Sequence, residues 1–212
     1  HLLASLVRRW GAVREAPPAE PRGARAANGG GNVEVLPEGT LLLGRNAGPA
    51  LAELLFARGY RARHVRVDTD FLAVGHVDEL FSHVVTGPQP CDFALLVASP
   101  ERGLAVAAPA VAPDARFVRV QRALEARIGA SRSALREAIV RHTPGCRPLA
   151  LAVPVTFDCR GDAPAPRDCR TTEPNPLNAI VLRRHVIVAD PGRAVPREAI
   201  ARLLRAHGQV PH

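Results

Sequence analysis

The chain has 212 residues, which is enough for one substantial hydrophobic core or for part of a larger domain. Its formal net charge is +8, and all 28 basic residues are arginine because the sequence contains no lysine. The arginines are spread over the whole sequence beside one tryptophan and one tyrosine, so a basic surface with stacking aromatics, and hence a nucleic-acid partner, is not expected. No apolar run approaches the length needed to cross a membrane, and no membrane partner is expected either.

The sequence begins at His1 and contains no methionine, which indicates a fragment. Its four cysteines lack the Cys-x-x-Cys spacing of structural zinc sites. Cys159 and Cys169 flank a proline-rich loop and could form a disulfide in an oxidising compartment. The apolar stretch near the N-terminus is too short for a signal sequence, so the sequence predicts a cytoplasmic protein, with secretion left open.

The order of the predicted elements is that of an α/β protein. Residues 1–29 are predicted to be a helix followed by a Pro/Gly-rich loop, and residues 30–212 a domain. Strands are predicted over Asn32–Leu36, Thr40–Leu43, Ala62–Val67, Phe93–Ala98, Leu149–Val153 and Ala179–Val188. Helices are predicted over Pro49–Arg58, from Pro100 after a Ser99 N-cap, over Phe117–Ile128 and Ser131–His142 with a break near Gly129, and over Pro196–Ala206. Strands thus alternate with helices, and no internal repeat is evident in the sequence.

Five ionisable side chains crowd a mostly apolar run, and such crowding is typical of functional sites. They are Asp68, Asp70, His76, Asp78 and Glu79. An extended strand here would place Val74, His76 and Asp78 on one face, as an apolar wall, a proton-transfer group and a carboxylate for a cation. The alternative is a mutually satisfied polar pair at the end of a sheet. Asp70 is expected to hold the preceding turn, and Asp68 to be solvated.

Residues 68–82 resemble the signature segment of the protein-arginine deiminases, in which Gly-His-Val-Asp-Glu follows an Asp and an aromatic residue. Four other segments resemble further segments of that family in the same order. They are Gly30–Val35, Leu95–Pro100, Val153–Phe157 and Asn175–Leu182. The resemblance implies the pentein architecture, an α/β propeller of ββαβ modules around a central pocket, incomplete in this chain.

The resemblance also implies an activity, the hydrolysis of the guanidinium of peptidyl arginine to citrulline and ammonia. In the family a cysteine attacks, a histidine is general acid and then base, and two aspartates hold the guanidinium. His76 and Asp78 match the histidine and one aspartate, so they are the expected catalytic residues, and Val74 and Asp78 are expected to contact the substrate. The motifs of the other aspartate and of the cysteine do not occur in this sequence, so the chain alone is expected to be inactive.

Vertebrate members of the family require calcium, a cation bound by oxygen atoms. By the resemblance, the Glu34 carboxylate and the Gly30 and Val33 carbonyls correspond to part of one calcium site. The expected partners are arginine-containing proteins or peptides. Two alternatives remain open at this point, a deiminase of a small guanidine such as arginine or agmatine and a non-catalytic pentein-like module that binds arginine-containing peptides. The sequence does not fix the oligomeric state.

Overall fold

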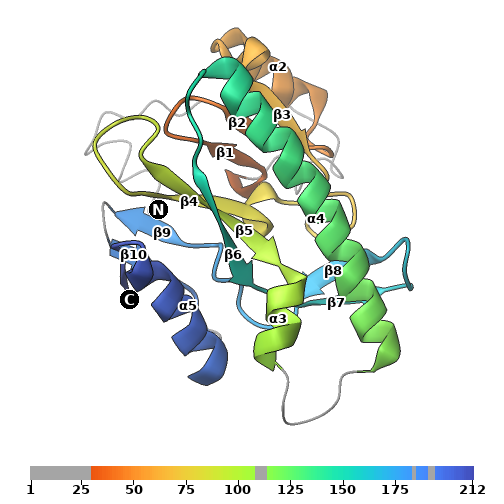
Figure 1. Cartoon of the computed structure of the whole chain (residues 1–212). Coiled ribbons are helices and arrows are strands. Elements are labelled where there is room, and N and C mark those ends of the chain that lie inside the picture. Colours follow the sequence, from red (N-terminus) through yellow and green to blue (C-terminus); the bar gives the residue numbers. More distant parts are fainter. Residues whose placement is uncertain (1–29, 108–113, 183–184, 191–193) are drawn as a thin grey trace, which may run out of the picture.

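The structure, a computed structural model, describes residues 30–107, 114–182, 185–190 and 194–212. These residues form three three-stranded sheets, one two-stranded sheet and the helices α2 to α5 (Figure 1). The predicted α/β class is therefore confirmed. No closed barrel is formed by the described residues. The helix and loop predicted for residues 1–29 lie outside the described part of the chain.

The first sheet consists of two antiparallel strands followed by a helix and a third, parallel strand. Strand β1 (Val33–Val35) pairs antiparallel with β2 (Leu41–Gly44). Helix α2 (Pro49–Ala57) then crosses back to β3 (His64–Val67), which pairs parallel with β2. Helix α2 begins at proline and ends before Gly59, whose φ of 96° stops the helix close to the predicted residue.

The second sheet repeats this connectivity with two helices in the crossover. Strand β4 (Phe81–Val85) pairs antiparallel with β5 (Phe93–Ser99), and β5 pairs parallel with β6 (Leu149–Pro154). Between β5 and β6 the chain forms α3 (Pro100–Ala107) and the long helix α4 (Ala115–His142). The Ser99 Oγ accepts the N–H of Arg102 at 3.2 Å, which confirms the predicted N-cap of α3.

The third sheet has the same order again. Strand β9 (Ile180–Leu182) pairs antiparallel with β10 (His185–Ile187), helix α5 (Ala194–Ala206) follows, and β11 (Val210–Pro211) pairs parallel with β10. In all three sheets the second strand is the central one. The described residues therefore form three ββαβ modules, a repeat that the sequence alone did not reveal. In Figure 1 the second sheet lies between the other two.

A hairpin of two strands is inserted between the second and third modules. Strand β7 (Phe157–Arg160) pairs antiparallel with β8 (Arg167–Thr171). The disulfide Cys159–Cys169 links these two strands, a pairing that the sequence had left open. A second disulfide, Cys91–Cys146, was not predicted; it connects the residue two positions before β5 to the loop that precedes β6.

Strand β5 and helix α4 are the centre of the main hydrophobic core. All seven residues of β5 are buried. Helix α4 presents an apolar stripe at intervals of four and seven residues, typical of a helix that packs one face on a sheet. The stripe is Val120, Leu124, Ile128, Leu135 and Ile139, each at most 2% exposed.

Helix α4 continues through Gly129, so the predicted break there is wrong. A helical glycine costs about 1 kcal/mol relative to alanine, which burial of the apolar stripe on both sides of it readily offsets. A polar link adds to this packing: Gln121, fully buried, donates to the Phe157 carbonyl at 2.7 Å and accepts the Phe157 N–H at 3.0 Å. Its amide thus completes the backbone hydrogen bonds at the start of β7.

The single strand predicted over Ala179–Val188 is also wrong, because β9 and β10 are antiparallel strands with Ile180 opposite Ile187. The residues between them carry no glycine, proline or asparagine, so the sequence gives no turn signal there. Strands β4, β7, β8 and β11 were not anticipated. Within the described ranges, no helix is both long and apolar enough to cross a lipid bilayer.

Two helical glycines give a matched test of the packing. A Cβ on Gly103 of α3 would lie 2.5 Å from the Val155 carbonyl oxygen, whereas a Cβ on Gly129 of α4 would meet nothing within 4 Å. We expect Gly103→Ala to lower the free energy of unfolding by about 1–3 kcal/mol, despite the better helix propensity of alanine. Gly129→Ala should raise it by up to about 1 kcal/mol. Urea denaturation of both variants measures the difference, and equal effects would contradict the close contact of α3 with the β6–β7 connection.

Candidate functional site

The segment that resembles the deiminase signature is a turn and a short helix in the structure. Residues Val77–Glu79 form the 3₁₀ helix η4, preceded by Gly75 at φ 79°. The Glu79 Oε1 accepts the backbone N–H of His76 at 3.2 Å, which fixes the start of this helix. The prediction of an extended strand with Val74, His76 and Asp78 on one face is therefore wrong.

His76 and Asp78 nevertheless lie close together. The His76 Nδ1 is 4.0 Å from the Asp78 Oδ1, and the two side chains are 22% and 33% exposed. Gly31, in the 3₁₀ helix η2 (Gly30–Asn32), packs against both residues. A Cβ there would lie 2.6 Å from His76 Nδ1 and closer still to the Asp78 carboxylate. Only glycine allows this approach, so the first module contributes a wall to the pair.

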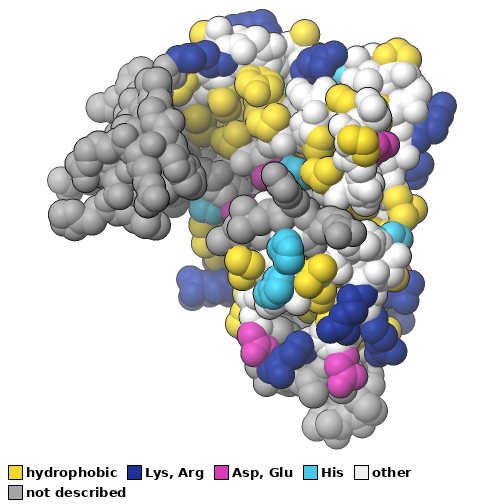
Figure 2. All heavy atoms as spheres, turned by 90° about the vertical axis from the view of Figure 1, so that its left-hand side faces the viewer, with side chains coloured by type: hydrophobic (Ala, Val, Ile, Leu, Met, Phe, Trp, Pro, Cys, Tyr) yellow, Lys and Arg dark blue, Asp and Glu magenta, His cyan; other side chains and the backbone are white. Residues whose placement is uncertain are grey.

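Asp78 faces an open cleft of about 510 Å³. Elements far apart in the sequence build this cleft: β1, η4, β4 and the segment that runs into β9. Its lining residues are Glu34, Asp78, Ser82, His83, Leu177, Asn178, Ala179 and Val181. The cleft thus combines two carboxylates, an imidazole, an amide and a hydroxyl with an apolar wall. Acidic and histidine side chains lie next to one another on the face of the molecule shown in Figure 2.

The Asp78 carboxylate is incompletely satisfied within the part of the chain that the structure describes. Burial raises the pKa of Asp78 above the ordinary value of 3.8, the nearby His76 lowers it, and the negative charge of Glu34 raises it further. The Oδ1 atom is buried and has no hydrogen-bond partner among the described residues. A buried carboxylate oxygen without a donor is costly, and a cationic ligand with N–H groups would satisfy it.

A second histidine–carboxylate pair lines the same cleft. The His83 Nδ1 lies 2.8 Å from the Glu34 Oε1, with the side chains 20% and 24% exposed. The imidazole packs edge-on against Phe93, with ring centroids 6.3 Å apart. The sequence analysis did not single out His83. The available signal was a histidine within a mostly apolar segment, but its partner lies 49 residues earlier.

The Asn175 side chain holds the opposite wall of the cleft against η4. The Asn175 Nδ2 donates to the Glu79 carbonyl at 2.9 Å, and its Oδ1 accepts the N–H of Leu177 at 3.0 Å. These bonds position Leu177 and Asn178 at the cleft. The segment Asn175–Leu182 and the signature segment, both identified by resemblance, are therefore in direct contact.

The expected roles of the two aspartates before the site are reversed. Asp68 is only 16% exposed, and Arg127 of α4 donates to both of its carboxylate oxygens at 2.8–3.0 Å, so the prediction of a solvated Asp68 is wrong. Asp68 also accepts the N–H of Asp70 at 3.4 Å. The Asp70 side chain is 45% exposed and lies 3.6 Å from Arg45. Asp68, rather than Asp70, holds the turn.

The other predicted site residues are placed as follows. Val74 is 46% exposed and is not among the residues that line the cleft. Of the three expected calcium ligands, Gly30 lies in η2, and Val33 and Glu34 lie in β1. Searching the described ranges for three or more His, Cys, Asp and Glu side chains arranged around a metal ion finds no such group.

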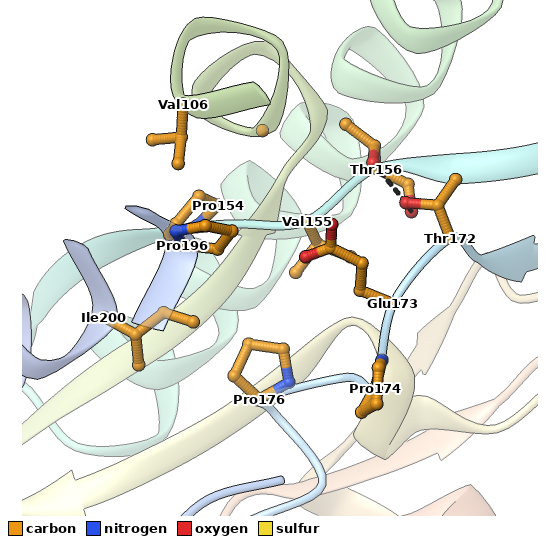
Figure 3. A pocket seen from close by; sticks show the side chains of 11 residues that line it. Val106, Pro154, Val155, Thr156, Thr172, Glu173, Pro174, Pro176, Pro196 and Ile200 are labelled. Atoms are coloured by element: carbon orange, nitrogen blue, oxygen red, sulfur yellow. Dashed lines mark hydrogen bonds between the residues drawn. The ribbon is translucent and has the colours of Figure 1, made fainter. Parts of the chain in front are cut away.

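A smaller cavity lies between α3, α5 and the connections that follow β6 and β8 (Figure 3). Proline and aliphatic side chains make up most of its wall, and among the described residues that line it Glu173 alone is ionisable. Figure 3 shows Glu173 pointing in beside Pro174 and Pro176, with Thr156 and Thr172 hydrogen-bonded at one edge. A single carboxylate in an apolar cavity offers less chemistry than the cleft at Asp78, which we take as the candidate site.

Comparison with known proteins does not assign the chain to a family. A scan against protein-family models finds no match, and a search of curated proteins finds none that is significantly similar. The deiminase resemblance therefore remains a hypothesis, based on the five segments and on the site's chemistry.

The raised pKa of Asp78 makes a prediction about stability. Because folded Asp78 keeps its proton to a higher pH than the unfolded chain does, its contribution to stability falls as pH rises through its folded pKa. Asp78→Asn removes the buried charge and should raise the melting temperature at neutral pH by roughly 1–4 °C. Below the ordinary carboxyl value of 3.8 the gain should disappear. Thermal melts over this pH range measure it; the exposed control Asp158→Asn should show no such trend, and a destabilised Asp78→Asn at neutral pH would contradict it.

Proposed function

We propose that the cleft at Asp78 binds the guanidinium of arginine residues in peptides or proteins, as part of a protein-arginine deiminase. The observation that carries the proposal is the buried Asp78 Oδ1 without a hydrogen-bond donor among the described residues, at the wall of an open cleft. A guanidinium is a planar, permanent cation with five N–H donors, so it could supply both the missing donors and the opposite charge.

The other residues of the cleft suit the same ligand. Glu34 adds a second carboxylate, and the Asn178 amide can accept a further N–H. Leu177 and Val181 would contact the aliphatic stem of an arginine side chain. A lysine ammonium would pair with the negative charge of the carboxylates, but it lacks the planar set of N–H donors of a guanidinium. The cleft should therefore bind arginine more tightly than lysine.

The arrangement of the chain supports the family assignment. Three ββαβ modules are the units from which a pentein propeller is built, although the described residues form no closed ring. Three of the five resembling segments, Gly30–Val35, residues 68–82 and Asn175–Leu182, contribute residues to the cleft. The remaining two lie in β5 and at the end of β6, in the sheet that also contains β4.

In this proposal His76 is the general acid and base, and Asp78 binds the substrate. His76 Nδ1 lies 4.0 Å from Asp78 Oδ1, so a guanidinium held by Asp78 would lie within reach of the imidazole. The Glu34 carboxylate and the Gly30 and Val33 carbonyls would be the ligands of the calcium ion that the resemblance implies, and no step of the proposal depends on that ion. The Glu34 Oε1 already contacts His83, and a calcium ion would have to compete with that contact.

One observation favours the non-catalytic alternative for the chain in this form. All four cysteines are bonded in the disulfides Cys91–Cys146 and Cys159–Cys169, so none provides a thiolate to attack a guanidinium carbon. A module that binds arginine peptides without turnover has the same cleft and needs no thiolate. The two disulfides also favour an oxidising compartment over the cytoplasm that the sequence predicts.

Binding of an arginine peptide tests the proposal directly. A short peptide with one central arginine should bind the chain, and the same peptide with citrulline or lysine should bind at least tenfold more weakly. Asp78→Asn should weaken binding of the arginine peptide by about 10- to 100-fold, the range for a charge-assisted hydrogen bond. Isothermal titration calorimetry measures both effects.

The matched control is Asp158→Asn, an exposed aspartate outside the cleft, which should bind like the parent. Equal affinity for arginine and citrulline peptides would refute guanidinium recognition. Free arginine and agmatine, titrated as competitors, separate a peptide site from a site for small guanidines: a peptide site requires the peptide to bind more tightly than either.

Turnover is a separate prediction. The 212-residue chain should release no citrulline from the arginine peptide, with or without calcium, because its cysteines are held in disulfides and catalytic groups that act as a unit lose nearly all rate without the nucleophile. A colorimetric citrulline assay measures this. Turnover that appears on reduction and disappears on replacing one cysteine would identify a nucleophile within the chain and contradict the non-catalytic alternative.

A further inference from the structure

Two histidines that do not line the cleft face each other on the third sheet. His185 begins β10, and His212 directly follows β11, which pairs parallel with β10. The backbone holds this position: the His212 N–H donates to the Val186 carbonyl at 2.9 Å, and the Val188 N–H donates to the His212 carbonyl at 3.2 Å. His185 and His212 are thus diagonal neighbours on adjacent strands, within reach of each other for long side chains.

Their imidazoles meet nitrogen to nitrogen at the surface. The His185 Nδ1 lies 2.9 Å from the His212 Nε2, with ring centroids 5.2 Å apart and ring planes inclined by 25°. Both residues are exposed. Histidine side chains lie side by side on the face of the molecule in Figure 2. One ring donates an N–H to the nitrogen of the other in this arrangement, and each ring can rotate because solvent surrounds it.

We propose that His185 and His212 chelate a divalent late transition-metal ion, Cu²⁺ or Ni²⁺, in place of the hydrogen bond between them, with the donating ring moving its proton to its other nitrogen. Imidazole nitrogens bind such ions at about 2.0–2.1 Å, so two nitrogens at adjacent corners of a square-planar or octahedral site are about 2.9 Å apart. A tetrahedral site would need about 3.3 Å. The observed separation of 2.9 Å matches the square arrangement. Rotation of both exposed rings then directs their lone pairs at one point, and solvent completes the coordination.

The surroundings set the charge at this site. His212 lines a cavity of about 370 Å³ together with Asp190, Arg197 and Arg205. Arg197 donates to both carboxylate oxygens of Asp190, at 3.0 and 2.9 Å, so these two charges are balanced. Arg205 adds a positive charge to the same cavity. Affinity must therefore come from the two nitrogens, and an anion such as chloride or a carboxylate is suited to the open coordination positions.

Nickel titration tests the chelate in the 212-residue chain. A His1→Ala background removes the histidine at the start of the sequence, whose terminal amine and imidazole could bind metal by themselves. NiCl₂ titrated calorimetrically at slightly alkaline pH should show one site per chain. His185→Ala and His212→Ala should each lower its affinity by at least tenfold, and the double variant should fall no further than either single one, because one remaining imidazole cannot chelate.

His207→Ala is the matched control, a histidine of the same module outside the pair, and should bind nickel within twofold of the parent. A second readout is the Cu²⁺ electron paramagnetic resonance spectrum, which should show coupling to two nitrogens in the parent and to fewer in either variant. Both pair residues are exposed, so metal-free variants should melt at the parent's temperature, and nickel should raise only the parent's. Affinity within twofold of the parent in His185→Ala or His212→Ala would overturn the proposal.

Discussion

Arg127 fixes the loop that leads from the first module into the candidate site. Its guanidinium donates to both carboxylate oxygens of Asp68 at 2.8–3.0 Å and lies 4.7 Å from the centre of the Phe71 ring. Because both partners belong to one loop, α4 restrains its position and its orientation. His76 and Asp78 follow within ten residues of Asp68. The location of the site thus depends on a helix that contributes no residue to the cleft, and that helix is positioned by its apolar stripe and by Gln121.

The buried carboxylates of the candidate site lower the free energy of unfolding. Burial raises the pKa values of both Asp78 and Glu79, so each carboxylate is less stable in the folded protein than in water. Glu79 is compensated by the backbone N–H of His76, whereas Asp78 Oδ1 has no such donor among the described residues. Groups kept in an unfavourable environment are common at binding sites, because a ligand that supplies the missing hydrogen bond or opposite charge then binds more tightly.

Local signals predicted much of the fold and little of the site. Pro49 and Gly59 marked the ends of α2, and Ser99 marked the start of α3, because caps act within a few residues. The signature segment was wrongly predicted to be an extended strand. Alternation of side chains between two faces does not reveal the positive φ at Gly75 or the hydrogen bond from the His76 N–H to the Glu79 side chain, which together form the turn and the short helix. His83 was missed since its partner, Glu34, is distant in sequence. The three modules share the order in which their strands pair. Many different apolar residues can form such strands, so the repeat is not visible as a repeated sequence.

The Cys91–Cys146 disulfide gives the molecule an unusual response to mechanical force. It joins residues 55 apart and encloses β5, α3 and α4 in a covalent ring. A chain pulled from its two ends could not extend this ring, so its contour length would be shorter by about 190 Å than that of a chain in which this one bond is reduced, at 3.3–3.6 Å per residue. An enzyme that pulls the polypeptide through a narrow pore would have to pass three segments of the chain side by side at the crosslink instead of one. It would stall there until the disulfide is reduced.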